Sequence, residues 1–308
     1  MKKTKIIQKI KNWFKEIKLP FLQGLSFYEL LHFYISGILK GALSYRAAAV
    51  SWSFFMALFP FALFILNLIP FIPIQNFQKD FMLFVSEAVP PNTYGAIENI
   101  INDILNNSHS GLLSSGFLLS VFLMTNGVNA IMSGFETSHH VIIKRAYFKQ
   151  YFVALGLSLL LTLILIITVS AIIIFEVIIQ KTIFQEVLSE RISNKISLIQ
   201  FGRYLFVLIM IIIVIATLFK FGIHQTRKRA FITVGTIFTT ILIIITSYFF
   251  GIWVVKFSKY NELYGSIGTL LIVMFYLWIN CMILLLGFEL DASIAKLKRY
   301  PEENPHLE

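Results

Sequence analysis

The residues best suited to chemistry in this sequence are polar side chains that interrupt long apolar runs. Asn126, Asn129, Ser133 and Glu136 recur at intervals of three and four, so they share one face of a helix. Polar groups inside a bilayer are costly and commonly mark a substrate or ion pathway. The stripe predicts either the lining of a polar cavity or hydrogen bonds between helices, and the pattern leaves both interpretations open.

Arg46 is the second candidate, because it stands near the start of the first apolar run. It predicts either a cation facing a cavity, able to bind an anionic headgroup or a carboxylate, or an arginine that reaches the lipid headgroups from the interface. Glu289 and Asp291 close the last run on the same side of the bilayer as Arg46 and Glu136. A network of Arg46, Glu136 and Glu289 fits their depths, and the sequence does not say whether they touch.

The full candidate set adds polar neighbours of these residues. The residues expected to bind substrate or line a cavity are Arg46, Tyr45, Asn126, Asn129, Ser133, Glu136, Ser266, Tyr276, Asn280 and Glu289. Towards the outer side, Glu176 and Arg203 lie at similar depth and form an expected polar pair, with separate interfacial anchoring as the alternative. No histidine, cysteine or carboxylate spacing matches a metal or nucleophile motif. We therefore expect no metal, no cofactor and no enzymatic activity.

Six long uncharged runs must position these side chains. Hydrophobic residues make up 57% of the 308 residues and charged residues 14%, against about 25% charged residues in a soluble domain. About 20 apolar residues cross the hydrocarbon layer of a bilayer as a helix. The sequence therefore predicts an all-α polytopic membrane protein with about six transmembrane helices. The expected spans cover residues 43–72, 111–135, 150–178, 197–220, 230–255 and 264–290.

The basic residues predict the orientation of these spans. Eighteen of the 26 Lys and Arg fall in alternate loops and both termini, seven fall in the remaining loops, and Arg46 lies in the first span. Positive loops stay in the cytoplasm, so both termini are expected to be cytoplasmic. The expected organisation is a cytoplasmic segment 1–40, a six-helix transmembrane domain 41–298 and a cytoplasmic tail 299–308.

Segments outside the spans also carry patterns. Residues 1–18 combine apolar residues at helical spacing with seven lysines, which predicts a basic amphipathic helix on an anionic membrane surface. Nucleic-acid binding is the less favoured explanation of these lysines. The outer loop 75–110 is expected to form short extracytoplasmic helices between the first and second spans.

Two stretches carry a family resemblance. They are ALSYRAAAVSWSFFMALFP at 42–60, and YGSIGT at 264–269 followed by Trp278 and LLLGFELDA at 284–292. With GVNAI at 127–131 and KRAYF at 144–148, they resemble the YihY/BrkB family of bacterial inner-membrane proteins over roughly residues 25–298. The family often has Gly-Ala-Glu-Leu-Asn where this chain has Gly-Phe-Glu-Leu-Asp, so Phe288 and Asp291 depart from its pattern.

The resemblance implies six membrane helices, two cytoplasmic ends and a bacterial inner-membrane location. Some members have carried the label ribonuclease BN, and others have been linked to serum resistance, lipid export and ion exchange. A nuclease would need a solvent-facing cluster of carboxylates or histidines, which the sequence does not offer, so ribonuclease activity is not expected.

The leading functional hypothesis is a transporter or flippase for an anionic lipid or a lipid-linked envelope precursor. Its expected partners are anionic membrane lipids and no nucleic acid. A cation/proton exchanger that titrates Glu289, Asp291 or Glu136 is one alternative, and a non-transport membrane scaffold is another. Assembly into a homo-oligomer stays open.

Overall fold

The computed structural model describes seven helical regions and a few short pieces. The described residues are 27–40, 42–68, 82–83, 86, 98–99, 101–102, 110–138, 141, 145–187, 194–224, 230–256 and 266–303. Within these ranges all regular structure is helical. The expected amphipathic helix at 1–18, and most of the expected short helices at 75–110, lie outside the described residues.

The long helices follow the uncharged runs of the sequence. They are α2 (Phe27–Lys40), α3 (Leu43–Leu68), α6 (Ser110–Glu136), α7 (Tyr147–Val187), α8 (Asn194–Phe221), α9 (Val234–Lys256) and α11 (Ser266–Glu303). Five of them, α6, α7, α8, α9 and α11, are long and apolar enough to cross a bilayer. Together, α2 and α3 pass the same test as a pair bent by 60°, which gives up to six spans. The prediction of an all-α polytopic membrane protein is confirmed.

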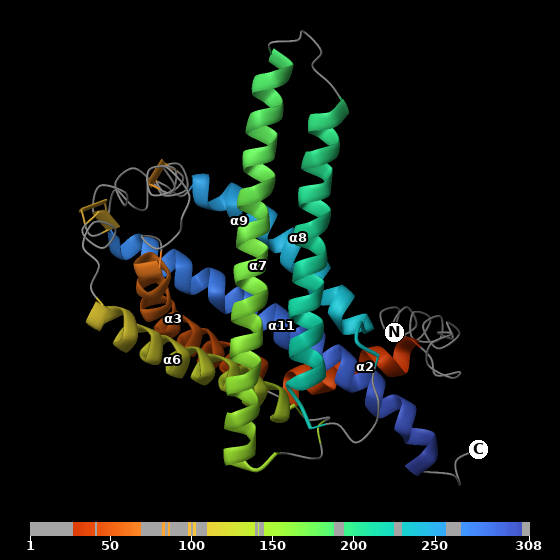
Figure 1. Ribbon diagram of the computed structural model, residues 1–308. Coiled ribbons are helices and arrows are strands. Elements are labelled where there is room, and N and C mark those ends of the chain that lie inside the picture. The colour runs from red at the N-terminus through yellow and green to blue at the C-terminus, as the bar shows by residue number, and fades with distance from the viewer. Residues whose placement is uncertain are drawn as a thin grey trace.

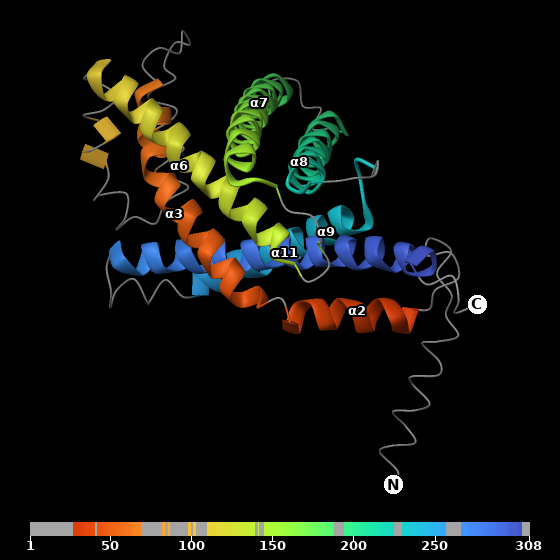
Figure 2. The same cartoon turned by 90° about the horizontal axis from the view of Figure 1, so that it is seen from below.

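The helices form a bundle with one hairpin set apart. Helix α3 packs against α6 and α11, α9 packs against α11, and α2 lies beside α11. Helices α7 and α8 pack against each other and form a hairpin that crosses the slanted α3, α6, α9 and α11 steeply (Figures 1 and 2). The hairpin joins the rest through contacts of α7 with α6 and of α8 with α9.

Burial is concentrated at one end of the bundle, which we call the closed end. There α6 and α8 end while α3, α7 and α9 begin. In the described part of α7, every buried side chain lies before residue 159. In α8 every buried side chain lies after residue 214, and in α9 every one lies before residue 241. Beyond those positions the described side chains of these helices are half-buried or exposed, although aromatic contacts still join α7 to α8 (Phe175 with Phe206) and α9 to α11 (Phe250 with Tyr276). We call the opposite end of the bundle, where α7 ends and α8 begins, the open end.

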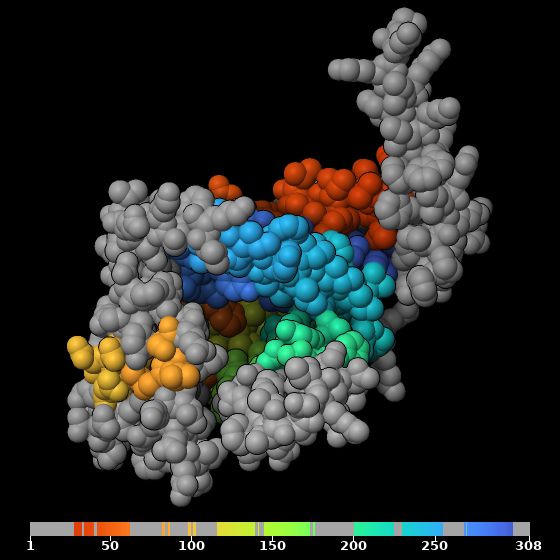
Figure 3. Space-filling model, turned by 90° about the horizontal axis from the view of Figure 1, so that it is seen from above, coloured from red at the N-terminus to blue at the C-terminus, as the bar shows by residue number. Residues whose placement is uncertain are grey.

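The surface of the bundle is hollowed on the open side. In the view from the side on which α7 ends, a hollow separates α9 from α8, and α3 and α6 are visible at its floor (Figure 3). The helices beside it expose large apolar side chains, including Leu163 of α7 and Tyr248 and Phe249 of α9. Exposed apolar side chains of this size are unfavourable in water, whereas lipid tails solvate them well.

Small residues allow α9 and α11 to touch at the closed end. A Cβ atom on Gly287 would lie 1.6 Å from the Thr239 Oγ1 atom, and one on Gly235 would lie 2.3 Å from the Gly287 carbonyl oxygen. Glycine at both positions therefore brings the two backbones together, as small residues commonly do in membrane helix pairs. This contact fixes the register of α9 against α11 and positions Asp291.

Candidate functional site

Arg46 and Glu289 form an ion pair inside the closed end. Arg46 lies in the first turn of α3, where its amide donates to the Ala42 carbonyl at 3.2 Å. Its Nη2 atom lies 3.4 Å from Glu289 Oε2, and its Nη1 atom donates to the Gly134 carbonyl at 2.8 Å. The side chains are 9% and 0% exposed, respectively. The pair therefore joins α3 to α11 and to the last turns of α6.

A third polar side chain completes this cluster. Ser138, just after α6, donates its hydroxyl to Glu289 Oε1 at 3.0 Å and is itself buried. Each carboxylate oxygen of Glu289 thus receives one of these donors. The hydrogen-bonding capacity of the guanidinium is only partly satisfied, because the buried Nε atom of Arg46 has no hydrogen-bond partner. A buried ion pair stabilises a fold only when further hydrogen bonds satisfy both groups, so this pair is incompletely stabilised.

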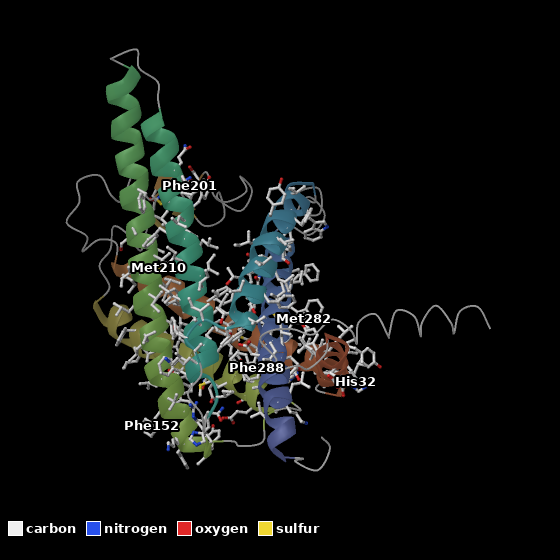
Figure 4. All side chains as sticks on the ribbon, turned by 90° about the vertical axis from the view of Figure 1, so that its right-hand side faces the viewer. His32, Phe152, Phe201, Met210, Met282 and Phe288 are labelled. Carbon is white, nitrogen blue, oxygen red and sulfur yellow. The ribbon has the colours of Figure 1, made fainter. Side chains whose placement is uncertain are left out.

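Three aromatic rings pack together beside the cluster. Phe288 directly precedes Glu289 in the sequence, and Phe135 directly follows Gly134. Phe135 of α6 stacks on Phe288 of α11 at 4.1 Å between ring centroids, and Phe219 of α8 meets both rings edge-on. Figure 4 places Phe288 between α8 and α11. All three rings are buried. They exclude water from this level of the bundle, which strengthens the attraction between the charges.

Glu136 does not pair with Arg46 but belongs to a separate clasp. Its Oε1 atom accepts the backbone amide of Arg145 at 3.3 Å. The guanidinium of Arg145 donates to the carbonyls of Phe221 and Ile223 at 2.9 and 2.8 Å, at the end of α8. Burial lowers the pKa of Arg145 from its ordinary value, and the Glu136 carboxylate opposes that shift. The clasp holds the connection between α6 and α7 against the end of α8.

The polar stripe of α6 is used for packing against α7. Gln150 donates from its Nε2 atom to Asn129 Oδ1 at 3.0 Å and to Ser133 Oγ at 2.9 Å. One turn nearer the open end, the hydroxyls of Thr125 and Ser158 are 3.2 Å apart. Of the two interpretations left open for Asn129 and Ser133, the structure therefore favours hydrogen bonds between helices.

Asp291 caps α9 from the neighbouring helix. Its Oδ1 atom accepts the Gly235 amide at 2.7 Å, and its Oδ2 atom accepts the Thr233 hydroxyl. A carboxylate is favoured at a helix N-terminus, where amides are unpaired and the helix dipole is positive. The charge that distinguishes Asp291 from the usual family asparagine thus has a structural partner in this chain.

The other predicted site residues lie apart from the ion pair. Tyr276 shares a hydrogen bond of 2.8 Å with Ser247 of α9, and Asn280 donates to the Tyr276 carbonyl of its own helix. Tyr45 is 82% exposed on the surface of α3, whereas Asn126 is half-buried.

Two predictions depend on side chains outside the part of the chain that the structure describes. The side chains of Ser266 and Glu176 lie outside the described residues, so the pairing of Glu176 with Arg203 stays a prediction. Arg203 itself lies against the neighbouring Tyr204, with its guanidinium carbon 5.1 Å from the ring centroid. Among the residues that the structure describes, no group of three or more His, Cys, Asp or Glu is placed to hold a metal ion.

Sequence reasoning missed the partners Ser138, Arg145 and Gln150. Ser138 and Arg145 lie just outside the apolar runs, where polar residues are ordinary, and nothing in their spacing marks a role. Gln150 carried a usable signal, since it is an uncharged polar residue in the first turn of a long apolar run. Such a residue usually finds a hydrogen-bond partner on an adjacent helix.

A comparison with known protein families covers the two sequence stretches that hold the ion pair. The family model described as virulence factor BrkB matches residues 34–308. The chain belongs to the BrkB family. The match includes both stretches that hold Arg46 and Glu289, and it identifies the protein as a multi-pass bacterial membrane protein, in accord with its five or six apolar helices.

Curated relatives cover most of the chain at low identity. The ribonuclease-like protein YfkH of Bacillus subtilis is 26% identical over 272 residues, which are 85% of this chain and 93% of the relative. A UPF0761 membrane protein of Coxiella burnetii is 24% identical over 258 residues, which are 82% of this chain and 88% of the relative. No solved structure matches the chain.

Proposed function

We propose that this BrkB-family protein is a non-catalytic membrane transporter, and that its substrate is an anionic lipid or a lipid-linked envelope precursor. The observation that carries the proposal is the buried ion pair between Arg46 and Glu289 at the closed end of a bundle that opens into an apolar hollow. The proposal assigns the hollow to the lipid tails and the ion pair to the gate.

The apolar side chains that α7 and α9 expose support a substrate with long apolar chains. Leu163 is 58% exposed, Tyr248 67% and Phe249 63%. Their exposure leaves these side chains open to apolar groups of the bilayer or of a bound substrate. An amphiphile entering from the bilayer would keep its tails in an apolar environment throughout, so that only its headgroup would need polar contacts inside the protein.

The ion pair supports a gate because of the elements that it joins. Arg46 belongs to α3 and Glu289 to α11, so breaking the pair removes a polar contact between two helices that line the same bundle. The positive-loop rule predicts that this end faces the cytoplasm. In the proposed cycle the closed end opens when Arg46 exchanges Glu289 for the substrate headgroup.

Lipid translocation in proteoliposomes tests this function. A fluorescent anionic lipid is reconstituted with the protein, and a membrane-impermeant quencher reports how fast inner-leaflet lipid reaches the outer leaflet. We expect translocation well above empty liposomes for the anionic lipid and not for a zwitterionic control. Arg46→Ala should slow it at least about tenfold, since a hydrogen bond to a charged group contributes about 1.5–3 kcal/mol.

The matched control is Arg203→Ala, which removes an arginine far from the closed end and should leave the rate unchanged. Size-exclusion profiles and thermal unfolding confirm that each variant is folded. Rates equal to those of empty liposomes, for a folded protein and several anionic lipids, would contradict lipid transport and favour a scaffold role.

A cation/proton exchanger is the second candidate, and the complete burial of Glu289 favours it. The two functions predict opposite behaviour for Glu289→Gln. An exchanger that titrates Glu289 would lose all ion flux in this variant. A lipid transporter in which Glu289 only closes the gate would keep lipid translocation. Measuring ion flux and lipid translocation on the same preparation separates them.

A further inference from the structure

The guanidinium of Arg46 has more donors than its surroundings use. Nη1 is bound to the Gly134 carbonyl, and Nη2 reaches Glu289 at 3.4 Å, the long end of hydrogen-bond distances. Nε is buried and has no hydrogen-bond partner, and the whole side chain is only 9% exposed. A buried donor without a partner is destabilising, so this edge of the guanidinium is available to a different acceptor.

Glu289 does not satisfy that edge in this structure, although a carboxylate can accept about four hydrogen bonds. A carboxylate has two oxygens, and here Oε2 faces Nη2 while Oε1 accepts the Ser138 hydroxyl at 3.0 Å. The Nε and Nη2 donors of an arginine form a fork that matches two oxygens of one anion. In this structure Glu289 accepts from Nη2 and from Ser138, and the remaining arm of the fork, Nε, has no acceptor.

We propose that Arg46 Nε, Arg46 Nη2 and Ser138 Oγ form an oxyanion-binding site for a phosphate monoester, and that Glu289 occupies this site as an internal competitor. The inference rests on the proposed transport function and names the headgroup class of its substrate. A phosphate monoester has three terminal oxygens, one for each donor. A phosphate diester has two, the same number as the carboxylate that already leaves Nε without a partner.

Charge explains how binding would open the gate. A phosphate monoester carries about −1.5 to −2 charges at neutral pH, so it binds arginine more strongly than a carboxylate does and repels the displaced Glu289. The other two buried carboxylates at this end have their own donors, because Glu136 accepts the Arg145 amide and Asp291 caps α9. The ligand therefore displaces Glu289 alone, and α3 must separate from α11 to admit it.

Binding to the full-length protein in a zwitterionic detergent tests the site without requiring transport. The probes are dioctanoyl phosphatidic acid as monoester, dioctanoyl phosphatidylglycerol as diester, and inorganic phosphate, titrated by calorimetry. We expect the monoester lipid to bind at least about tenfold more tightly than the diester, as one added charge-assisted hydrogen bond would give. Ser138→Ala should remove most of that preference.

Glu289→Gln separates competition for the site from a purely structural role, because only competition predicts a higher affinity for the monoester in this variant. Removing the competing charge should tighten monoester binding about tenfold or more, whereas Arg46→Lys, which keeps the charge without the fork, should weaken it. Arg203→Lys is the matched control and should change nothing. Equal affinities for monoester and diester, or weaker binding by folded Glu289→Gln protein, would overturn the proposal.

The remaining outcomes distinguish the site from the transport function. Inorganic phosphate bound as tightly as phosphatidic acid would support the oxyanion site but contradict a lipid substrate. Monoester-selective binding without translocation in liposomes would support the site and contradict transport. Translocation of monoester and diester lipids at equal rates would contradict the site and leave transport standing.

Discussion

The closed end and the open end of this bundle differ in what holds their helices together. At the closed end, carboxylates, arginines and backbone groups from different helices are bonded to each other, and two glycines bring α9 and α11 into backbone contact. Towards the open end, α7, α8 and α9 expose apolar side chains and bury none in the described part. The difference indicates that specific contacts maintain closure while lipid solvates the open walls.

Among the variants considered, a glycine substitution at the closed end should reduce the free energy of unfolding most. Gly287→Ala places a methyl group 1.6 Å from Thr239 Oγ1 at the closed end, and we expect a loss of about 3 kcal/mol in the free energy of unfolding, the upper part of the usual range for overpacking. Gly251→Ala meets nothing within 4 Å and should be neutral or slightly stabilising. Thermal unfolding in detergent compares the two, and equal midpoints would contradict the account.

Breaking the ion pair should have the next largest effect. Arg46→Ala leaves the fully buried Glu289 carboxylate without its cation, and removing one partner of a buried pair usually costs about 3–5 kcal/mol. Because the Arg46 side chain is 9% exposed, truncating it opens a route for water to the carboxylate, and we expect about 2.5 kcal/mol, just below that range. The double variant Arg46→Ala/Glu289→Ala should be more stable than Arg46→Ala alone, as a double-mutant cycle of unfolding free energies would show.

The cap on α9 should contribute less. Asp291→Ala removes the acceptor of the Gly235 amide and of the Thr233 hydroxyl, with an expected cost of about 2 kcal/mol for charge-assisted hydrogen bonds. Asp291→Asn keeps one acceptor oxygen and should cost about half as much. Hydrogen exchange of the first amides of α9 measures the effect locally. Unchanged protection in Asp291→Ala would show that α11 does not hold this helix end.

The smallest effect is expected for the hydrogen bond between Tyr276 and Ser247, farther towards the open end. Tyr276→Phe keeps the ring contact with Phe250 and removes only the hydroxyl. Hydrogen bonds between membrane helices contribute about 0.6 kcal/mol on average, so the unfolding midpoint should barely move. A loss as large as that of Arg46→Ala would show that stability is not concentrated at the closed end.

Sequence predicted the fold well because bilayer thickness sets helix length and composition together. The apolar runs fix α6, α7, α8, α9 and α11, and none of these needs tertiary contacts to be recognised. The pairing of Arg46 with Glu289 was compatible with their depths, yet depth alone could not choose between Glu136 and Glu289. That choice depends on the rotation of each helix about its axis, which the Gly235–Gly287 contact and the α3–α6 packing determine.

The sequence did not predict the hydrogen-bond partners that lie outside the apolar runs. Ser138 and Arg145 meet Glu289 and the end of α8 only because the chain folds back after α6. Their polarity carries no information at a membrane interface, where polar residues are expected. The polar stripe of α6 was recognised as a face, but its use in binding Gln150 required knowledge of which helix lies beside it.

The most direct test of the account is a distance measured across the closed end during ligand binding. Spin labels on cysteines at Ala49, an exposed position of α3, and Ala295 of α11, in a Cys281→Ser background, report this distance by pulsed electron paramagnetic resonance. We predict one distance without ligand, and a second, longer one when dioctanoyl phosphatidic acid is added or when Glu289→Gln releases the ion pair. A distribution that stays unchanged while the same protein translocates lipid would contradict a gate made by Arg46 and Glu289.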